Sequence, residues 1–164
     1  MRHATLLFLS LLVACSGDEL SVRQQFLAQS SVSVQFDTWV RSINNQNQDS
    51  LDLVYRHVPE IKALNINGTV SRGWDEAREN WIEFFDEMEI VNLVTDVHEI
   101  EVLTEDLVLM TFRYSLDTER YDREPGLSVS GRGSMVWTND AVDNLWKIHL
   151  QHLSVRYRIG ESLR

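Results

Sequence analysis

Apolar residues recur at every third or fourth position through the first half of the chain, which is the spacing of amphipathic helices. One such stripe predicts a long helix from about residue 22 to 45, ended by the polar run NNQNQDS. A short second helix is predicted over LDLVYRHV, residues 51–58, which Pro59 closes. The clearest helix is RGWDEARENWIEFFDEM, residues 72–88, with one apolar and one acidic face. Asn67-Gly68, between these two helices, predicts a hairpin.

Beyond residue 88 the pattern changes to an alternation of apolar and polar residues, which is typical of strands with one buried face. Four long strands are predicted, over residues 89–103, 107–117, 127–138 and 145–157. A turn at 104–106, the charged loop TERYDREPG and the segment NDAVDN connect them. Helices first and antiparallel strands last predict an α+β domain, with the helices packed on one side of a curved sheet.

The first fifteen residues have the features of a bacterial lipoprotein signal. Arg2 precedes a ten-residue apolar run, residues 4–13, which is too short to span a bilayer. The run ends in LVAC, which resembles a lipobox. Cys15 is the only cysteine and cannot form an internal disulfide, so lipidation is its predicted role; the alternative is a buried thiol in an ordinary hydrophobic segment. We therefore expect a signal peptide over 1–14, a tether over 15–21 and a domain over 22–160.

The residue after the cysteine indicates where the protein is located, and the net charge of the chain excludes some classes of partner. In the lipoprotein sorting pattern, Ser16 rather than Asp indicates the outer membrane of a Gram-negative source. We expect the domain at its periplasmic face, held there only by lipid. The formal net charge is −10, and loss of Arg2 with the signal leaves 14 basic against 25 acidic residues. Such a surface repels nucleic acid and anionic lipid, so neither is an expected partner of the folded domain.

Three features together resemble the nuclear transport factor 2-like superfamily. They are the order of the elements, the sequence GWDEARENW in the third helix, and the ending W-K-I-x-x-x-H-x-S. The SnoaL-like and ketosteroid-isomerase-like domains are the most similar branch, over residues 22–157. The resemblance implies a cone, in which a curved antiparallel sheet wraps around the N-terminal helices and leaves a pocket at its open end. It also implies a homodimer through the outer sheet face, and a family that contains both enzymes and ligand-binding proteins.

The stretch WKIHLQHLS places two histidines three residues apart. In a regular strand His149 and His152 face opposite sides, so they cannot converge on one metal, and we expect neither a metal nor a cofactor. His152 falls on the predicted inner face. It is either a core histidine held by a hydrogen bond or a pocket-lining group that transfers protons. The predicted inner face consists of Trp146, Ile148, Leu150, His152 and Ser154.

Three further residues are candidates for the pocket. Arg132 lies opposite His152 in one register of the last two strands, where it would suit a carboxylate ligand. The apolar residues of its strand occupy the other face, however, and if that face is the core, Arg132 is a surface residue. Tyr114 lies on a fully apolar strand face, and its hydroxyl needs a partner if it is buried. Trp81 lies on the apolar face of the third helix, where a tryptophan can line the pocket mouth.

These residues support three hypotheses of function. The leading one is a lipid-anchored SnoaL-like domain that binds an unidentified small, largely apolar molecule in its cone pocket. The alternative is an isomerase or lyase that uses His152 with Tyr114 or Arg132, which requires these groups to converge in one cavity. Isomerase chemistry also needs a carboxylate base, and Asp37 on the first helix could equally be solvated. The third hypothesis is a non-catalytic dimeric scaffold.

Overall fold

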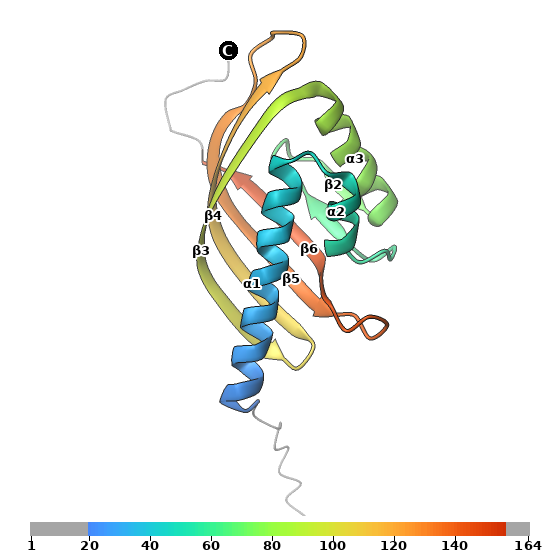
Figure 1. Cartoon of the computed structure of the whole chain (residues 1–164), viewed down its shortest axis with the longest axis vertical. Helices are drawn as coiled ribbons and strands as arrows, with labels where there is room; N and C mark the ends of the chain where they lie inside the picture. Colours follow the sequence, from blue (N-terminus) through green and yellow to red (C-terminus); the bar gives the residue numbers. More distant parts are fainter. Residues whose placement is uncertain (1–19, 157–164) are drawn as a thin grey trace, which may run out of the picture.

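The computed structural model describes residues 20–156, except for the side chain of His98 (Figure 1). Cys15 and the predicted signal peptide lie outside the described residues. The helices are α1 (Val22–Asn44), α2 (Gln48–Val54) and α3 (Trp74–Glu87). The strands are β1 (Lys62–Leu64), β2 (Val70–Arg72), β3 (Met88–Thr104), β4 (Leu107–Arg120), β5 (Ser128–Asn139) and β6 (Trp146–Val155). The predicted α+β order of helices and long strands is confirmed.

Polar side chains cap the starts of α1 and α2. Ser21 and Gln24 form a capping box at the start of α1, in which each side chain accepts a hydrogen bond from the other residue's main-chain N–H. Asn47 caps α2, so this helix begins three residues before the predicted position. It also ends earlier than predicted, because Tyr55 leaves the helix to form a parallel bridge with Ile148.

The six strands form one sheet in the order β2-β1-β6-β5-β4-β3. The four long strands are antiparallel neighbours, as predicted, but β1 pairs with β6 in parallel, so the sheet is mixed rather than wholly antiparallel. The Tyr55–Ile148 bridge explains this difference, because it already brings the chain alongside β6 in the parallel direction before β1 begins. The predicted hairpin joins β1 to β2, with Gly68 at φ 84° in its turn.

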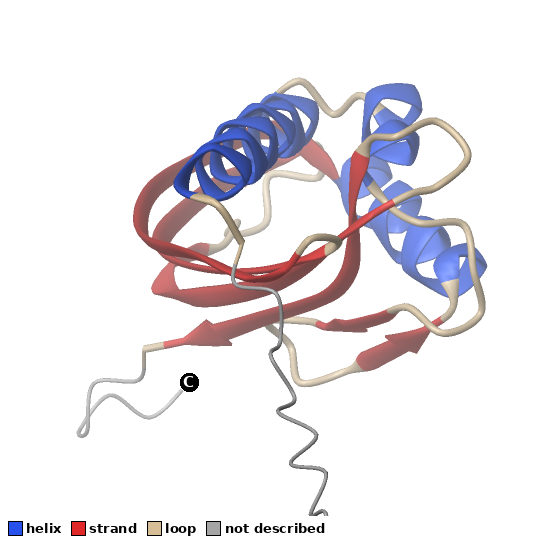
Figure 2. Cartoon of the chain, turned by 90° about the horizontal axis from the view of Figure 1, so that it is seen from below, coloured by secondary structure: helices blue, strands red, loops and turns tan. Residues whose placement is uncertain are grey.

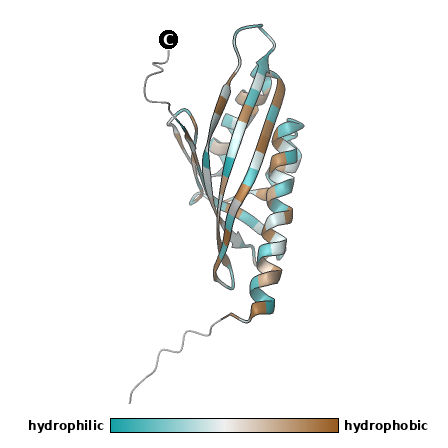
Figure 3. Cartoon of the chain, turned by 90° about the vertical axis from the view of Figure 1, so that its left-hand side faces the viewer, coloured by the Kyte–Doolittle hydropathy of each residue, from teal (hydrophilic) through white to brown (hydrophobic). Residues whose placement is uncertain are grey.

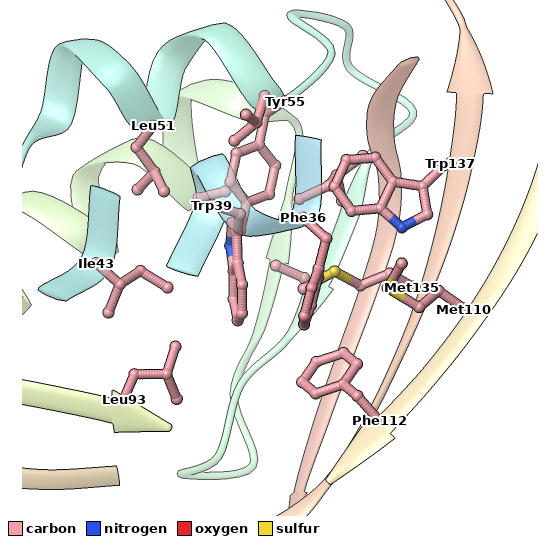
Figure 4. Close-up of a cluster of buried hydrophobic side chains, with 14 of the residues drawn as sticks. Phe36, Trp39, Ile43, Leu51, Tyr55, Leu93, Met110, Phe112, Met135 and Trp137 are labelled. Carbon is pink, nitrogen blue, oxygen red and sulfur yellow. The ribbon is translucent and has the colours of Figure 1, made fainter. Parts of the chain in front are cut away.

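All three helices lie on the concave side of the curved sheet (Figure 2). The core fills the space between α1 and the sheet, where Phe36 and Trp39 meet Phe112 of β4 (Figure 4). The ring centroids of Phe36 and Phe112 are 4.9 Å apart, and those of Trp39 and Phe112 are 5.9 Å apart. Hydrophobic and hydrophilic residues alternate along the long strands (Figure 3). This alternation turns one face of the sheet to α1 and the other to solvent.

The edge strand β3 is held to α1 by side-chain amides. The side-chain amide of Asn44 forms both hydrogen bonds that a neighbouring strand would form with Leu93. Its Nδ2 donates to the carbonyl of Leu93 at 3.0 Å, and its Oδ1 accepts from the Leu93 N–H at 2.6 Å. Gln29 and Gln46 donate to other carbonyls of the same strand. These bonds satisfy main-chain groups that an open sheet edge leaves unpaired, and they fix α1 across the mouth of the curved sheet.

A β-bulge in β6 changes the predicted alternation of side chains. On β5, Trp137 pairs with Ile148 and Val136 pairs with Leu150, so His149 has no partner on that strand. One extra residue in a strand moves every later side chain to the opposite face. The predicted inner face is therefore correct up to Ile148 and wrong from Leu150 onward.

Candidate functional site

A cavity of about 280 Å³ lies between α1, α3, the β1–β2 hairpin and the inner face of the sheet. This volume is close to the lower end of the range for small-molecule sites, roughly 300–1,000 Å³. Its wall is mainly aromatic and aliphatic, with contributions from Trp39, Trp81, Phe84, Leu93, Leu116 and Leu153. A cavity of this size and lining suits a molecule with one or two rings.

A buried hydrogen-bond network lies beside the cavity. The hydroxyl oxygen of Tyr55 accepts hydrogen bonds from the indole N–H groups of Trp39, at 3.1 Å, and Trp81, at 3.3 Å. A tyrosine hydroxyl has one proton, and here it is donated to Oε1 of Gln151. This donation fixes the orientation of the glutamine amide, with its oxygen toward Tyr55 and its nitrogen elsewhere.

The amide nitrogen of Gln151 has no hydrogen-bond partner within residues 20–156. The side chain lines the cavity but is only 1% exposed, and the nitrogen has less than 1 Å² of accessible surface. An unpaired buried donor of this kind costs about 1–3 kcal/mol. A residue of the cavity wall therefore carries a buried hydrogen-bond donor that has no partner within the described residues.

Neutral polar groups hold the hairpin to α3 at the other side of the cavity. The hydroxyl oxygen of Ser71 accepts hydrogen bonds from Nδ2 of Asn65, at 3.1 Å, and from Nδ2 of Asn80, at 2.6 Å. Both asparagines line the cavity. These amides give this side of the cavity polar but uncharged groups.

The charged residues that line the cavity are acidic. Glu83 and Glu87 are both exposed at its border, and Glu87 forms an ion pair with Arg120 at 2.7 Å. Within the described part of the chain, the lining includes no lysine, arginine or histidine. An anionic ligand would therefore meet the carboxylate of Glu83, whereas Arg120 already balances the charge of Glu87.

Tyr114 and Trp81, two of the predicted pocket residues, line the cavity. The hydroxyl of Tyr114 donates to the main-chain carbonyl of Ser154 at 3.2 Å. Burial raises the pKa of Tyr114 to about 12 and raises the pKa of Tyr55 further. Both tyrosines therefore stay protonated at physiological pH and act as hydrogen-bonding groups rather than as bases.

Stability should fall as the pH rises above 10. The two tyrosines ionise near pH 10 in the unfolded chain, but Tyr114 ionises near pH 12 in the folded one and Tyr55 higher still. Between these values the folded state holds more protons, so the free energy of unfolding declines by at most about 1.4 kcal/mol per pH unit for each tyrosine. Urea unfolding between pH 8 and about pH 11 measures the decline. Tyr114→Phe should make it shallower, and an equal decline in the variant would contradict this assignment.

Solved structures share this architecture. A nuclear transport factor 2-like superfamily protein from Salmonella enterica serovar Typhimurium superimposes with a TM-score of 0.74 at 20% identity, over 84% of this chain and 99% of that one. The chain has the nuclear transport factor 2-like fold. A proposed scytalone dehydratase from Novosphingobium aromaticivorans has a TM-score of 0.74 at 10% identity, over 88% of this chain and 94% of that one. A hexachlorocyclohexane dehydrochlorinase has a TM-score of 0.71 at 8% identity, over 88% of this chain and 97% of that one.

The comparisons establish the fold but do not identify an activity. No protein-family model matches the sequence, and no curated protein matches it. Proteins that share the nuclear transport factor 2-like fold differ in function, so the activity has to be argued from the cavity. Within residues 20–156, no group of three or more His, Cys, Asp or Glu side chains is arranged to hold a metal ion.

His152 does not point into this nuclear transport factor 2-like cone. The prediction that it shares a face with Trp146 and Ile148 is wrong, because the bulge at His149 turns it outward, where it is exposed. Gln151, predicted to face outward, takes the inner position instead. The H-x-S ending is thus present in the sequence, but its histidine lies outside the cavity.

Arg132 also lies on the outer face, where it is paired with Arg113 of β4 and is exposed. The expectation that it lines the pocket is wrong, because Met135 and Trp137 form the buried face of β5. The alternative prediction, in which Arg132 is a surface residue because the apolar face of its strand is the core, is therefore correct.

His152 therefore does not converge with Tyr114 or Arg132 in one cavity, as the predicted catalytic combination requires. Tyr114 is on the inner face of the sheet, whereas His152 and Arg132 are on the outer face. Asp37, considered as a base, is exposed on α1 and does not line the cavity. An isomerase or lyase built on these residues is excluded by their placement.

Sequence reasoning missed Gln151 and Tyr55, which form the polar part of the cavity wall and the network behind it. Regular alternation in β6 places Gln151 outside, and no feature of the sequence marks the bulge. Tyr55 was assigned to the second helix, where nothing indicated a hydrogen bond to a strand at the other end of the chain. The amphipathic pattern does find Trp81, one of the two tryptophans that donate to Tyr55.

Proposed function

We propose that this domain binds a small, neutral, largely apolar molecule in the cavity of the cone. The observation that carries the proposal is the cavity of about 280 Å³, whose wall is aromatic and aliphatic and whose border is acidic. Transfer of an apolar molecule from water to such a wall is favourable by roughly 25 cal/mol per Å² of apolar surface buried. The few polar groups can orient the ligand and distinguish it from other apolar molecules.

We favour binding over catalysis because of the ionisable groups at the cavity. A proton-transfer enzyme needs an acid or base whose pKa lies near the working pH. Among the described lining residues, Glu83 and Glu87 are exposed carboxylates, and Tyr114 has a pKa of about 12. The dehydrochlorinase with the same fold shows that such cones can hold an enzyme. Here, the aromatic wall and the protonated tyrosine support a binding role.

We also propose that Cys15 is lipidated and holds the domain at the periplasmic face of the outer membrane. The support is in the sequence: LVAC after a short apolar run, and a single cysteine. No helix within residues 20–156 is long and apolar enough to cross a membrane. The helix α1 begins at Val22, shortly after Cys15, so the membrane would lie close to the start of this helix.

The outer sheet face supports a homodimer as part of the proposal. Leu109, Val136 and Leu150 are adjacent across β4, β5 and β6, and all three are half-buried on this face. An apolar row of this kind on an outer sheet face can be covered by a second copy of the chain. Sedimentation velocity distinguishes such a dimer from a monomer.

Ligand-dependent thermal unfolding tests the binding proposal. The described residues form their own core, so a chain lacking residues 1–15 is expected to fold. Tetralin, a bicyclic hydrocarbon, at about 100 times its Kd should stabilise this chain by about 2.7 kcal/mol, which corresponds to roughly 5–10 °C in Tm. Leu153→Trp, which fills the cavity from β6, should abolish the shift. An equal shift in this variant would place binding elsewhere, and no shift in the unmodified domain would contradict the proposal for ligands of this class.

A further inference from the structure

We infer that the ligand carries a neutral hydrogen-bond acceptor, such as a ketone carbonyl, and that the amide nitrogen of Gln151 recognises it. This inference rests on the proposed function, since it concerns the same cavity. It assigns to Gln151 the role of distinguishing a carbonyl compound from a hydrocarbon of the same shape.

The hydrogen-bond network determines which end of the amide is available. Tyr55 already accepts from two indole N–H groups, and its only proton goes to the oxygen of Gln151. The amide oxygen is therefore engaged, and the nitrogen must face a different direction. A donor can be satisfied only by an acceptor, so a hydrocarbon leaves it unpaired, whereas a carbonyl oxygen satisfies it.

Gln151 differs from the other buried polar groups that lack a partner. Within residues 20–156, Oε1 of Gln48, Nε of Arg56, Nε1 of Trp137 and Nδ1 of His149 are also buried without a hydrogen-bond partner. Of these residues, Gln151 is the one that lines the cavity. Gln151 therefore combines two features, an unpaired buried donor and a position in the cavity wall.

The side chain of Gln151, rather than its strand, has to adjust to the ligand. Its nitrogen has less than 1 Å² of accessible surface, so it does not reach the open part of the cavity in the structure shown. The backbone is fixed on both sides, because Gln151 is paired with Met135 of β5 and with Ala63 of β1. The inference requires a small rotation of the amide about its oxygen, which keeps the hydrogen bond from Tyr55 and brings the nitrogen to the open part of the cavity.

The charge of the cavity border selects a neutral acceptor over a carboxylate. Glu83 and Glu87 lie at this border, and Arg120 offsets the charge of Glu87 but not that of Glu83. A ligand carboxylate could accept from Gln151, but it would lose its hydration next to the like charge of Glu83. A ketone or similar neutral carbonyl accepts the same bond without this cost.

A matched pair of molecules tests the inference. α-Tetralone and tetralin share a bicyclic frame and differ in one carbonyl group. Isothermal titration of both into the chain lacking residues 1–15 is compared with the same titrations into Gln151→Met. The affinity for α-tetralone should fall by about tenfold in the variant, the usual loss when one hydrogen bond is removed, whereas the affinity for tetralin should stay the same or rise. Leu153→Met is the control: it changes the cavity wall on the same strand and leaves the donor in place.

The outcomes separate this inference from the proposed function. If neither molecule binds the unmodified chain, the proposed function fails for ligands of this class. If both molecules bind and Gln151→Met lowers the two affinities equally, or lowers neither, the cavity binds ligands but Gln151 does not form a hydrogen bond to the carbonyl.

Should Gln151→Met fail to fold, the infrared band of the bound carbonyl decides the question in the unmodified chain. A hydrogen bond from Gln151 shifts this band of α-tetralone to lower frequency than in hexane. An unshifted band overturns the inference.

Discussion

Gly133→Ala is expected to lower the free energy of unfolding by about 3 kcal/mol, at the upper end of the cost of overpacking a core. A Cβ at this position would lie 2.1 Å from Cζ of Phe112 and within 2.6 Å of two more atoms of the same ring. The ring cannot move away freely, because Phe36 and Trp39 pack against it. Alanine normally suits a strand better than glycine, so a loss of stability would come from this close approach alone. Urea unfolding monitored by tryptophan fluorescence measures it.

A double-mutant cycle isolates the contact. Phe112→Leu alone removes part of a core side chain that is 2% exposed, and should itself be destabilising. Combined with Gly133→Ala, however, the smaller leucine leaves room for the new methyl group. The double variant should therefore be more stable than the sum of the two single effects predicts. Strict additivity would show that the glycine is needed for another reason.

Elements with a long, uniform pattern could be predicted from the sequence. The apolar stripe of α1 predicts an end at residue 45, and the helix ends at Asn44. The third helix, predicted over 72–88, spans Trp74–Glu87. Tyr114 and Trp81 were placed at the pocket for the same reason, since both lie on apolar faces without interruption. In these segments the same face of the helix or strand is buried along its whole length, so the spacing of apolar residues predicts which side chains face the core.

Local departures from regularity could not be predicted. The bulge at His149 exchanges the positions expected for His152 and Gln151. As a result, the polar side chain that β6 contributes to the cavity is Gln151 instead of His152. The alternation of W-K-I-H-L-Q-H-L-S is ambiguous, because Leu150 and Leu153 lie on either side of the change. A motif shared with a superfamily therefore supports the fold here, but it does not place the side chain that the motif contains.

Contacts between distant segments were also beyond the sequence. Tyr55 follows α2, yet it bridges to Ile148 and its hydroxyl reaches Gln151, both near the other end of the chain. Nothing near Tyr55 in the sequence indicates these partners, since they come together only when β1 and β6 pair. The polar part of the candidate site is built mainly from such contacts, whereas its apolar wall comes from periodic segments. This difference explains why the apolar wall of the cavity was easier to predict than its polar groups.

Cys15→Ser is expected to release the protein from membranes while leaving the domain folded. The core lies within the described residues, so the substitution should not change the thermal unfolding of the domain. Each buried methylene of an acyl chain contributes about 0.8 kcal/mol to membrane binding, and stable anchoring requires more than one chain. Without acyl chains, a protein with a formal net charge of −10 is repelled by anionic lipid. Fractionation of cells that express each form measures the change.

Ser16→Ala is the matched control, because it alters the neighbouring residue and keeps the thiol that would be acylated. This variant and the unmodified protein should both remain in the membrane fraction and resist washing with high salt, which removes proteins held only by charge. Cys15→Ser should appear in the soluble fraction once its signal segment has been removed. Lipidation at Cys15 is wrong if the unmodified protein is itself soluble, or if Cys15→Ser, cleaved after its signal segment, stays on membranes through the same wash.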